Sequence, residues 1–140
     1  MIIYKKKFIA DPDKKREFRK KLGKLIDNVL KNENCNVSSL NLIFCSDEYI
    51  KEYNKKYLGH DYETDIITFH DKDEEGRTEG ELLISVDTVK SNSKKYKTSF
   101  KDELNRVVIH GVLHLCGYND KTPSQKRAIR KKENYFLNQK

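Results

Sequence analysis

His110, His114 and Asp120 are the residues whose types and spacing could do chemistry in this chain. Two histidines four residues apart on a helix project from the same face, so both imidazoles can bind one metal ion. Gly117 follows three residues after His114, where a helix can end in a left-handed conformation that costs glycine nothing. The chain can then fold back and let Asp120 offer a carboxylate oxygen. Two nitrogens, one oxygen and a position left open for water are typical of a catalytic zinc site rather than a structural one.

A purely structural role for the histidine pair is the alternative, because histidines also reach helical spacing by chance. The surrounding residues favour metal binding. They are apolar on nearly every side and predict a buried helix: Val107, Val108, Ile109, Val112, Leu113 and Leu115. Buried imidazoles need polar partners, and a glycine and a carboxylate stand at the offsets that would complete a metal site.

The elements that must position these residues can be read from apolar periodicity and from helix caps. The helix that carries the histidines should run from 100 to about 116, with Ser99 as its N-cap. Four other helices are expected. The first covers 12–30 and follows Asp11, and the second begins at Ser46-Asp47 and ends at Gly59. The third covers 88–96 with Asp87 as its cap, and the fourth begins at 123, within the capping box Thr122-Pro-Ser-Gln125. Apolar and β-branched segments predict strands over 2–9, 37–45, 64–69 and 81–86. No repeat or linker interrupts them, so residues 1–140 predict a single α+β domain.

Length and composition favour a small cytoplasmic protein. At 140 residues and 16.6 kDa, the chain can bury ~70% of its unfolded surface in one domain. No apolar run approaches the ~20 residues that span a bilayer, and the N-terminus has no signal-peptide pattern, so no membrane partner is expected. Cys35, Cys45 and Cys116 are odd in number and widely spaced, which indicates reduced thiols, with Cys116 packed in the core.

The charge balance is basic and points to a polyanionic partner. Lysine and arginine number 29 against 22 acidic residues, which gives a net charge of +7. Basic residues gather in three segments, 14–24, 90–97 and 126–132, while acidic residues gather between 71 and 81. Such a surplus favours nucleic acid, although a lysine-rich surface that is merely solvated is the alternative.

Three segments of the chain form a recognisable pattern: His110 to Tyr118, which reads His-Gly-Val-Leu-His-Leu-Cys-Gly-Tyr, then Tyr57 to Phe69, and Gly80 to Ser85. In order and spacing they resemble the YbeY family of ribosomal RNA maturation factors. The resemblance implies a mixed four-stranded sheet packed with about five helices. It also implies an endoribonuclease with one zinc ion, or another divalent metal, that cuts single-stranded RNA in small-subunit rRNA 3′-end processing and ribosome quality control. The implied partners are rRNA and the ribosome or its proteins.

The chain departs from this family pattern at two positions. The usual third ligand is a histidine, and Asp120 stands there instead, a legitimate but harder zinc ligand. The usual arginine before the glycine of the second segment is Leu58, which puts a phosphate-binding role there in doubt. Lys55, Lys56 or His60 are candidates to replace it.

Two further residues have open roles. Asp65 could orient a ligand histidine from behind, or it could cap a turn. Tyr118 could stack on an unpaired base, or it could pack beneath the turn after the metal-site helix. His60 and His70 are expected on the surface or in loops.

Two other functions remain as alternatives to a nuclease. A metalloprotease of the His-Glu-x-x-His class needs a general base directly after the first histidine. That position is Gly111, and Asp102 and Glu103 lie two turns too early to replace it. A ribosome assembly factor with a purely structural metal is the second alternative.

Overall fold

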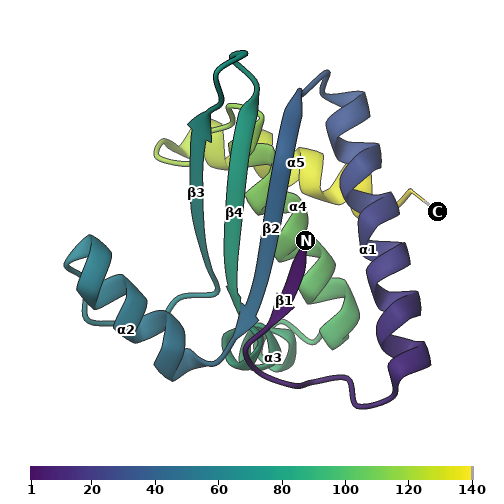
Figure 1. The fold of residues 1–140 in the computed structure, drawn as a ribbon, viewed down its shortest axis with the longest axis vertical. Helices are drawn as coiled ribbons and strands as arrows, with labels where there is room; N and C mark the ends of the chain where they lie inside the picture. The colour runs from purple at the N-terminus through teal and green to yellow at the C-terminus, as the bar shows by residue number, and fades with distance from the viewer. Residues whose placement is uncertain (140) are drawn as a thin grey trace.

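Four strands and five helices make up residues 1–139, the part of the chain that the computed structural model describes (Figure 1). The strands are β1 (Ile2–Tyr4), β2 (Val37–Cys45), β3 (Ile66–Lys72) and β4 (Thr78–Ser85). The helices are α1 (Pro12–Asn32), α2 (Asp47–Leu58), α3 (Val86–Lys95), α4 (Phe100–Leu115) and α5 (Pro123–Leu137). The expected α+β class, with a mixed four-stranded sheet and five helices, is confirmed.

The strands form one sheet in the order β1-β2-β4-β3. β1 and β4 both run parallel to β2, and β3 pairs antiparallel with β4 through a hairpin. This arrangement leaves β3 as the edge strand beside the C-terminal half of α4.

The main core lies between one face of the sheet and the helices α1, α3, α4 and α5; in Figure 1, α4 and α5 lie behind the sheet and α1 stands beside it. Leu82 and Ile84 of β4 point into this core, whereas Leu83 between them points to the opposite face, as the alternation of a strand requires. On that opposite face, Ile50 of α2 packs with Leu83 and Ile67 in a smaller cluster. No helix within residues 1–139 has the length and apolar character needed to cross a membrane.

Helix caps follow the sequence patterns closely. The N-caps are Asp11, Ser46, Ser99 and Thr122, the last within a complete capping box with Gln125. Gly59 closes α2 with a φ of 71°, a left-handed conformation that glycine adopts without strain.

The strand expected over residues 2–9 is wrong in length, because β1 ends at Tyr4. The next two backbone N–H groups both donate to the Phe44 carbonyl, at 2.7 and 3.2 Å, so the chain leaves the ladder there. Phe8 then turns inward, and its ring lies 5.5 Å from that of Phe18 and 5.3 Å from that of Phe44. The apolar residues after Tyr4 therefore belong to an aromatic cluster, and not to the sheet. The hairpin strands differ as well, since β3 covers 66–72 and β4 begins at 78.

The cap expected at Asp87 is also wrong. The Ser85 hydroxyl accepts the Thr88 N–H at 3.3 Å and starts α3 two residues earlier. The Asp87 carboxylate instead accepts the Asp47 N–H at 3.0 Å and pairs with the Lys6 ammonium. This side chain therefore joins the segment after β1 to the first turns of α2 and α3.

Candidate metal centre

The C-terminal half of α4 presents His110 and His114 from one face, one turn apart. Their Nε2 atoms lie 3.0 Å from each other, and each side chain is about three-quarters buried. The orientation of α4 is set by its contact with the sheet at Gly111. A Cβ atom there would lie 2.7 Å from Cδ1 of Ile66 and 2.9 Å from a Cδ atom of Leu82. The helix therefore lies close against the sheet, and its two imidazoles are left facing the loop that follows.

A tight turn after α4 brings the third group to the histidines. The Gly117 N–H donates to the His114 carbonyl and the Tyr118 N–H donates to the Leu113 carbonyl, both at 3.1 Å. These two bonds form a Schellman motif, and Gly117 takes the positive φ of 99° that the motif requires. The chain then reverses and places Oδ2 of Asp120 beside both imidazoles.

The three groups fit one metal ion. Oδ2 of Asp120 lies 3.3 Å from Nε2 of His110 and 3.4 Å from Nε2 of His114. Ligands of a tetrahedral zinc ion at ~2.0–2.1 Å are about 3.3 Å apart, which matches these separations. The three donor atoms also all lie within 4.8 Å of one another. His110, His114 and Asp120 could therefore hold a divalent metal ion, as the sequence spacing predicts.

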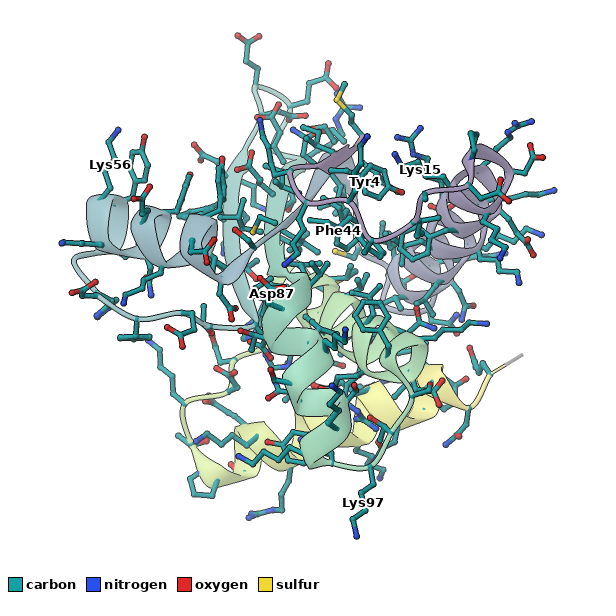
Figure 2. The ribbon with its side chains drawn as sticks, turned by 90° about the horizontal axis from the view of Figure 1, so that it is seen from below. Tyr4, Lys15, Phe44, Lys56, Asp87 and Lys97 are labelled. Atoms are coloured by element: carbon teal, nitrogen blue, oxygen red, sulfur yellow. The ribbon has the colours of Figure 1, made fainter. Side chains whose placement is uncertain are left out.

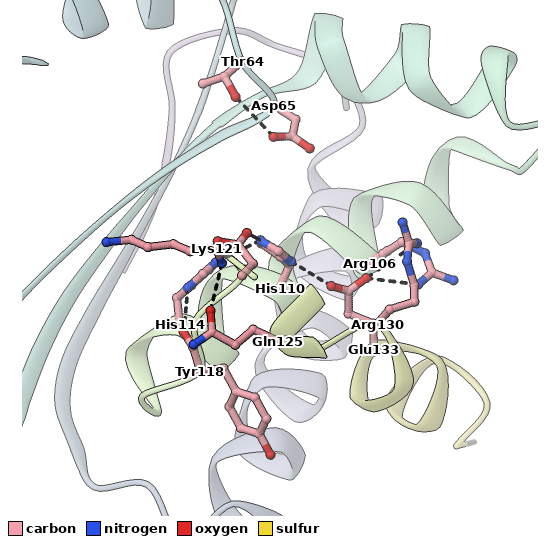
Figure 3. A network of polar contacts seen from close by, with 11 residues as sticks. Thr64, Asp65, Arg106, His110, His114, Tyr118, Lys121, Gln125, Arg130 and Glu133 are labelled. Atoms are coloured by element: carbon pink, nitrogen blue, oxygen red, sulfur yellow. Dashed lines mark hydrogen bonds and ion pairs between the residues drawn. The ribbon is translucent and has the colours of Figure 1, made fainter. Parts of the chain in front are cut away.

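A buried carboxylate orients the first histidine (Figure 3). Oε2 of Glu133 lies 2.7 Å from Nδ1 of His110, and Glu133 is only 3% exposed. Its other oxygen accepts from Arg106 at 3.1 Å and lies 3.7 Å from Arg130. A carboxylate in this position fixes both the rotation of the imidazole and the nitrogen that carries the proton.

The main chain orients the second histidine. Nδ1 of His114 lies 2.8 Å from the carbonyl oxygen of Tyr118. A carbonyl oxygen can only accept a hydrogen bond, so Nδ1 carries the proton and the lone pair of Nε2 faces Asp120. When both histidines are neutral, their Nε2 atoms and Oδ2 of Asp120 are three acceptors that face one another without a hydrogen-bond donor. A bound cation would compensate this cluster of acceptors.

The charges around the site are coupled. Burial opposes protonation of His110, but the hydrogen bond to Glu133 and the charges of Glu133 and Asp120 outweigh it and raise the pKa of His110 above 6.5. Burial likewise opposes the charged form of Glu133, but the bonds from His110 and Arg106 hold the pKa of Glu133 below its ordinary value. Glu133 is therefore an anion at neutral pH.

A cavity of about 810 Å³ opens beside the three groups. The edge strand β3 supplies one wall, and the loop after α4 supplies another. His70 is exposed, as expected, and it belongs to β3, from which it lines this cavity. The cavity gives the metal group open access from the outside.

Asp65 and Tyr118, for each of which the sequence leaves two roles open, both line this cavity. The carboxylate of Asp65 accepts from the Thr64 hydroxyl at 3.4 Å and bonds to neither histidine (Figure 3). The Nδ1 atoms of the two histidines contact Glu133 and the Tyr118 carbonyl instead, so Asp65 does not orient either imidazole. Tyr118 is half-buried against the core, and its hydroxyl donates to the carboxylate of Glu33 at 3.2 Å. Packing beneath the turn therefore accounts for Tyr118.

The basic residues of α2 lie apart from the metal group. Lys55 and Lys56 occupy the last turn of α2, and Figure 2 shows Lys56 at the outer part of this helix. Leu58 ends the helix and is 43% exposed, and His60 follows it; none of these four residues lines the cavity. Cys116 packs against the main core, as expected.

Glu133 is the residue of the site that the sequence reasoning did not single out, and one signal for it was present. On α5, Ile129, Glu133 and Phe136 follow helical spacing and are all buried. A glutamate on the apolar face of a helix needs a charged or hydrogen-bonding partner. The sequence therefore marked Glu133 as unusual, although it could not name His110 as its partner.

The closeness of α4 to the sheet also bears on the protease alternative. The residue after the first histidine would carry the general base of such an enzyme. Here it is Gly111, whose missing side chain would point at Ile66 and Leu82 rather than at the metal group. The position cannot supply a catalytic carboxylate in this fold.

Comparisons with known proteins agree with this geometry. The family model described as endoribonuclease YbeY matches residues 5–140. A relative named endoribonuclease YbeY from Bacteroides fragilis is 46% identical over 137 residues, which cover 97% of this chain and 95% of the relative. Another of the same name from Cytophaga hutchinsonii is 46% identical over 112 residues, covering 80% of this chain and 78% of the relative. The solution structure of TM1509 from Thermotoga maritima matches with a TM-score of 0.66 and 28% identity, over 98% of this chain and 87% of that one. The chain therefore belongs to the endoribonuclease YbeY family.

Proposed function

We propose that this protein is a zinc-dependent endoribonuclease that cuts single-stranded RNA. The observation that supports this most is the convergence of His110, His114 and Asp120 beside an open cavity, in a chain whose relatives are named endoribonucleases. Two nitrogens and one oxygen leave a fourth position free, as catalytic zinc sites do.

The proposed ligands are the Nε2 atoms of His110 and His114 and a carboxylate oxygen of Asp120. Zinc held there supplies Lewis-acid chemistry, because it polarises a phosphoryl oxygen and makes water easier to deprotonate. Asp120 in place of the family's usual histidine adds a negative charge and a harder donor, so we expect metals that favour oxygen ligands to compete better than they would against three histidines.

The chain's own residues have three tasks in this proposal. Glu133 and the Tyr118 carbonyl hold the two imidazoles in the rotation and tautomer that binding needs. The wall formed by β3 leaves room for an extended strand of RNA. Asp65 is the one carboxylate lining the cavity, among residues 1–139, that does not belong to the metal group, so we assign it the proton transfer next to the substrate. Asp65→Asn should slow cleavage and leave the zinc content unchanged; equal loss of zinc would make Asp65 a binding residue instead.

In the cell, we propose that the protein works in the cytoplasm on the 3′ end of small-subunit rRNA and in ribosome quality control, in contact with the ribosome or its proteins. The net charge of +7 suits such a polyanionic partner. Residues 1–140 would act as one domain, because the main core takes residues from the sheet and from α1, α3, α4 and α5, while α2 packs on the other face of the same sheet.

The test is cleavage of an unstructured RNA by purified protein with and without a chelator. Wild type should cut, a chelator should stop cutting, and His114→Ala should abolish both cutting and stoichiometric zinc while the circular dichroism spectrum stays unchanged. His60→Ala is the matched control, since it removes an imidazole that lies outside the cavity and should keep the zinc.

Each contrary outcome points to a different function. Cutting by His114→Ala at the wild-type rate would place the activity at another site. If neither protein cuts but both bind rRNA, the assembly factor with a structural metal is favoured. Cleavage of peptides by wild type alone would favour the protease.

A further inference from the structure

A second cavity, of about 550 Å³, adjoins the metal group and shares Asp65, His110 and Asp120 with the first. We propose that this second cavity binds the RNA backbone on one side of the cut, with Tyr96 stacking on an unpaired base at its rim. The inference rests on the proposed RNA substrate and names the surface that holds it.

The walls of this cavity come from three helices. The end of α3 contributes Tyr96; α4 contributes Glu103 and Arg106; and α5 contributes Lys126, Arg130 and Glu133. Two of the three basic segments of the sequence, 90–97 and 126–132, therefore meet at this cavity, although 28 residues separate them in the chain. Of the residues of these two segments, only Arg130 enters the description of the metal site, through its 3.7 Å contact with Glu133.

The charges of the cavity leave cations available for phosphate. The carboxylate of Glu133 is already paired with His110 and Arg106. Glu103 is only 6% exposed, and burial raises the pKa of its carboxyl. Lys126 is exposed and forms no ion pair within residues 1–139. Arg130 lies 3.7 Å from Glu133, yet its side chain is 62% exposed, so most of its N–H groups can reach an outside ligand.

More lysines extend this basic surface beyond the cavity. Lys94, Lys95 and Lys97 are exposed at the end of α3, and Figure 2 shows Lys97 projecting from this end of the molecule. A single-stranded backbone carries one negative charge per nucleotide, so a row of cations next to a cutting site is the arrangement that would hold it in register.

Tyr96 offers the aromatic surface that single-stranded RNA uses. Its ring is 58% exposed, and the ammonium of Lys95 lies 5.5 Å from the ring centroid. Aromatic rings of this kind stack on unpaired bases without regard to sequence. An exposed tyrosine elsewhere on the surface would mean little; this one stands at the rim of a cavity that leads to His110.

The two cavities together suggest a path for the RNA. Because they share Asp65, His110 and Asp120, a strand that fills both passes over the proposed cutting site, with nucleotides held on each side. The β3 side would hold one flank of the cut, and the side formed by α3 and α5 would hold the other.

The test compares two charge-removing pairs in the His114→Ala background, which keeps the RNA intact during measurement. Lys126→Gln with Arg130→Gln removes two cations from the cavity. Lys14→Gln with Lys20→Gln is the matched control, since both lysines are exposed on α1. Binding of a fluorescein-labelled unstructured RNA is followed by anisotropy at several salt concentrations. The cavity pair should weaken binding on the order of tenfold at low salt and flatten the slope of log K against log salt by about 1.4, which is ~0.7 per lost phosphate contact.

Two further variants separate the proposal from structural damage. Lys126→Gln alone leaves the contact between Arg130 and Glu133 intact and should still flatten the slope by about 0.7. Tyr96→Ala should weaken binding about fivefold or more, whereas Tyr135→Ala, on the opposite face of α5 from Glu133, should not. RNA carrying 4-thiouridine should crosslink to peptides that contain residues 94–97 or 126–130.

The proposal is overturned if the cavity pair binds RNA as tightly as its parent, or if both charge pairs weaken binding equally, since charge would then act diffusely. The RNA-binding proposal and the proposed nuclease activity can be refuted separately. A wild-type protein that binds RNA through the cavity but does not cut it would contradict only the nuclease activity, whereas a protein that binds no RNA would contradict both proposals.

Discussion

Glu133 carries a buried negative charge that three residues share. Its carboxylate lies against His110 and Arg106, and Arg130 stands slightly farther away. A buried charge is tolerated only while its partners remain, and removing one partner typically costs about 3–5 kcal/mol. The side chain therefore links the stability of the α4–α5 contact to the orientation of a metal-site histidine.

Glu133→Gln keeps the shape of this side chain but removes its charge. We expect zinc affinity to fall about 10- to 100-fold, because the imidazole of His110 loses the carboxylate that orients it. The melting temperature should fall too, because Arg106 is left without its anion. Competition with a chromophoric chelator measures the first effect and thermal unfolding the second. Glu52→Gln, an exposed glutamate of α2, is the control, and equal zinc affinity in both variants would refute the orienting role.

The dependence of zinc affinity on pH follows from the pKa of His110. A proton and a metal ion compete for Nε2, and although burial works against the proton, Glu133 and Asp120 raise this pKa above 6.5. Affinity should therefore be full well above the raised pKa and fall as pH drops through it. Calorimetric titrations between about pH 5.5 and 8 would show this, and Glu133→Gln should move the fall to lower pH. A flat profile would mean that His110 is not a ligand.

At the scale of residues, the sequence was sufficient to predict those parts of the metal site that lie close together in the chain. His110 and His114 share a face because of helical periodicity, and Gly117 predicts the turn that returns Asp120 to them. Glu133 was missed because its partner lies on another helix, and the packing of α5 on α4 cannot be read from either segment alone.

Among the elements, α2, α3 and the segment after β1 meet at the carboxylate of Asp87. It accepts the first N–H of α2 and pairs with Lys6, which lies just past β1. The bond from Lys6, opposed by burial and aided by the Asp47 N–H, holds the pKa of Asp87 below 3.8. The Asp87 side chain thus connects α3 to α2 and to the segment that follows β1.

Asp87→Asn should destabilise the protein by about 1 kcal/mol at pH 7, through a weaker helix cap and the loss of the Lys6 pair. Because the folded pKa is depressed, this stabilisation is present above about pH 4 and is lost as pH falls through the folded pKa. Urea unfolding at pH 7 and at pH 3 should therefore show a difference between wild type and variant that shrinks in acid. A difference that stayed constant would show that charge plays no part.

Gly111→Ala sets two effects against each other. Alanine is better than glycine within a helix by about 1 kcal/mol. The new methyl group, however, would stand 2.7 Å from Ile66 in a packed interface, and such overpacking costs about 1–3 kcal/mol. We expect a net loss of stability, measurable by urea unfolding. The helical Gly23 has open space beside it, so Gly23→Ala should stabilise the protein and serves as the control.

Helices were predicted better than strands, for a physical reason. Helix ends depend on local caps such as Ser46, Ser99 and Thr122, which the sequence displays. Strand ends depend on a partner strand, so β1 proved shorter than expected and the hairpin strands longer. The mixed four-stranded sheet was expected from the family resemblance, whereas the order of the strands became known only from the structure.

For the molecule as a whole, the main core is built from apolar side chains of the sheet and four helices, and none of the three metal-binding side chains belongs to it. The fold should therefore survive without metal. This sets a catalytic metal apart from a structural one, whose removal unfolds the protein.

Zinc should raise the stability of the intact protein without being required for it. Apoprotein should show a cooperative thermal transition, and zinc at 100 times its Kd should add about 2.7 kcal/mol. His114→Ala should melt cooperatively and gain almost nothing from zinc. An apoprotein without a cooperative transition would favour the assembly factor with a structural metal.

The absence of a side chain at Gly111 limits how the activity of this protein could change in evolution. Peptidases that share the paired histidines depend on a glutamate at this position, yet here such a side chain would begin within 3 Å of methyl groups of Ile66 and Leu82. A protein with this packing could not acquire that chemistry by one substitution, because the contact between α4 and the sheet would first have to change. The close packing of one helix on the sheet therefore limits which reactions members of this family could come to catalyse.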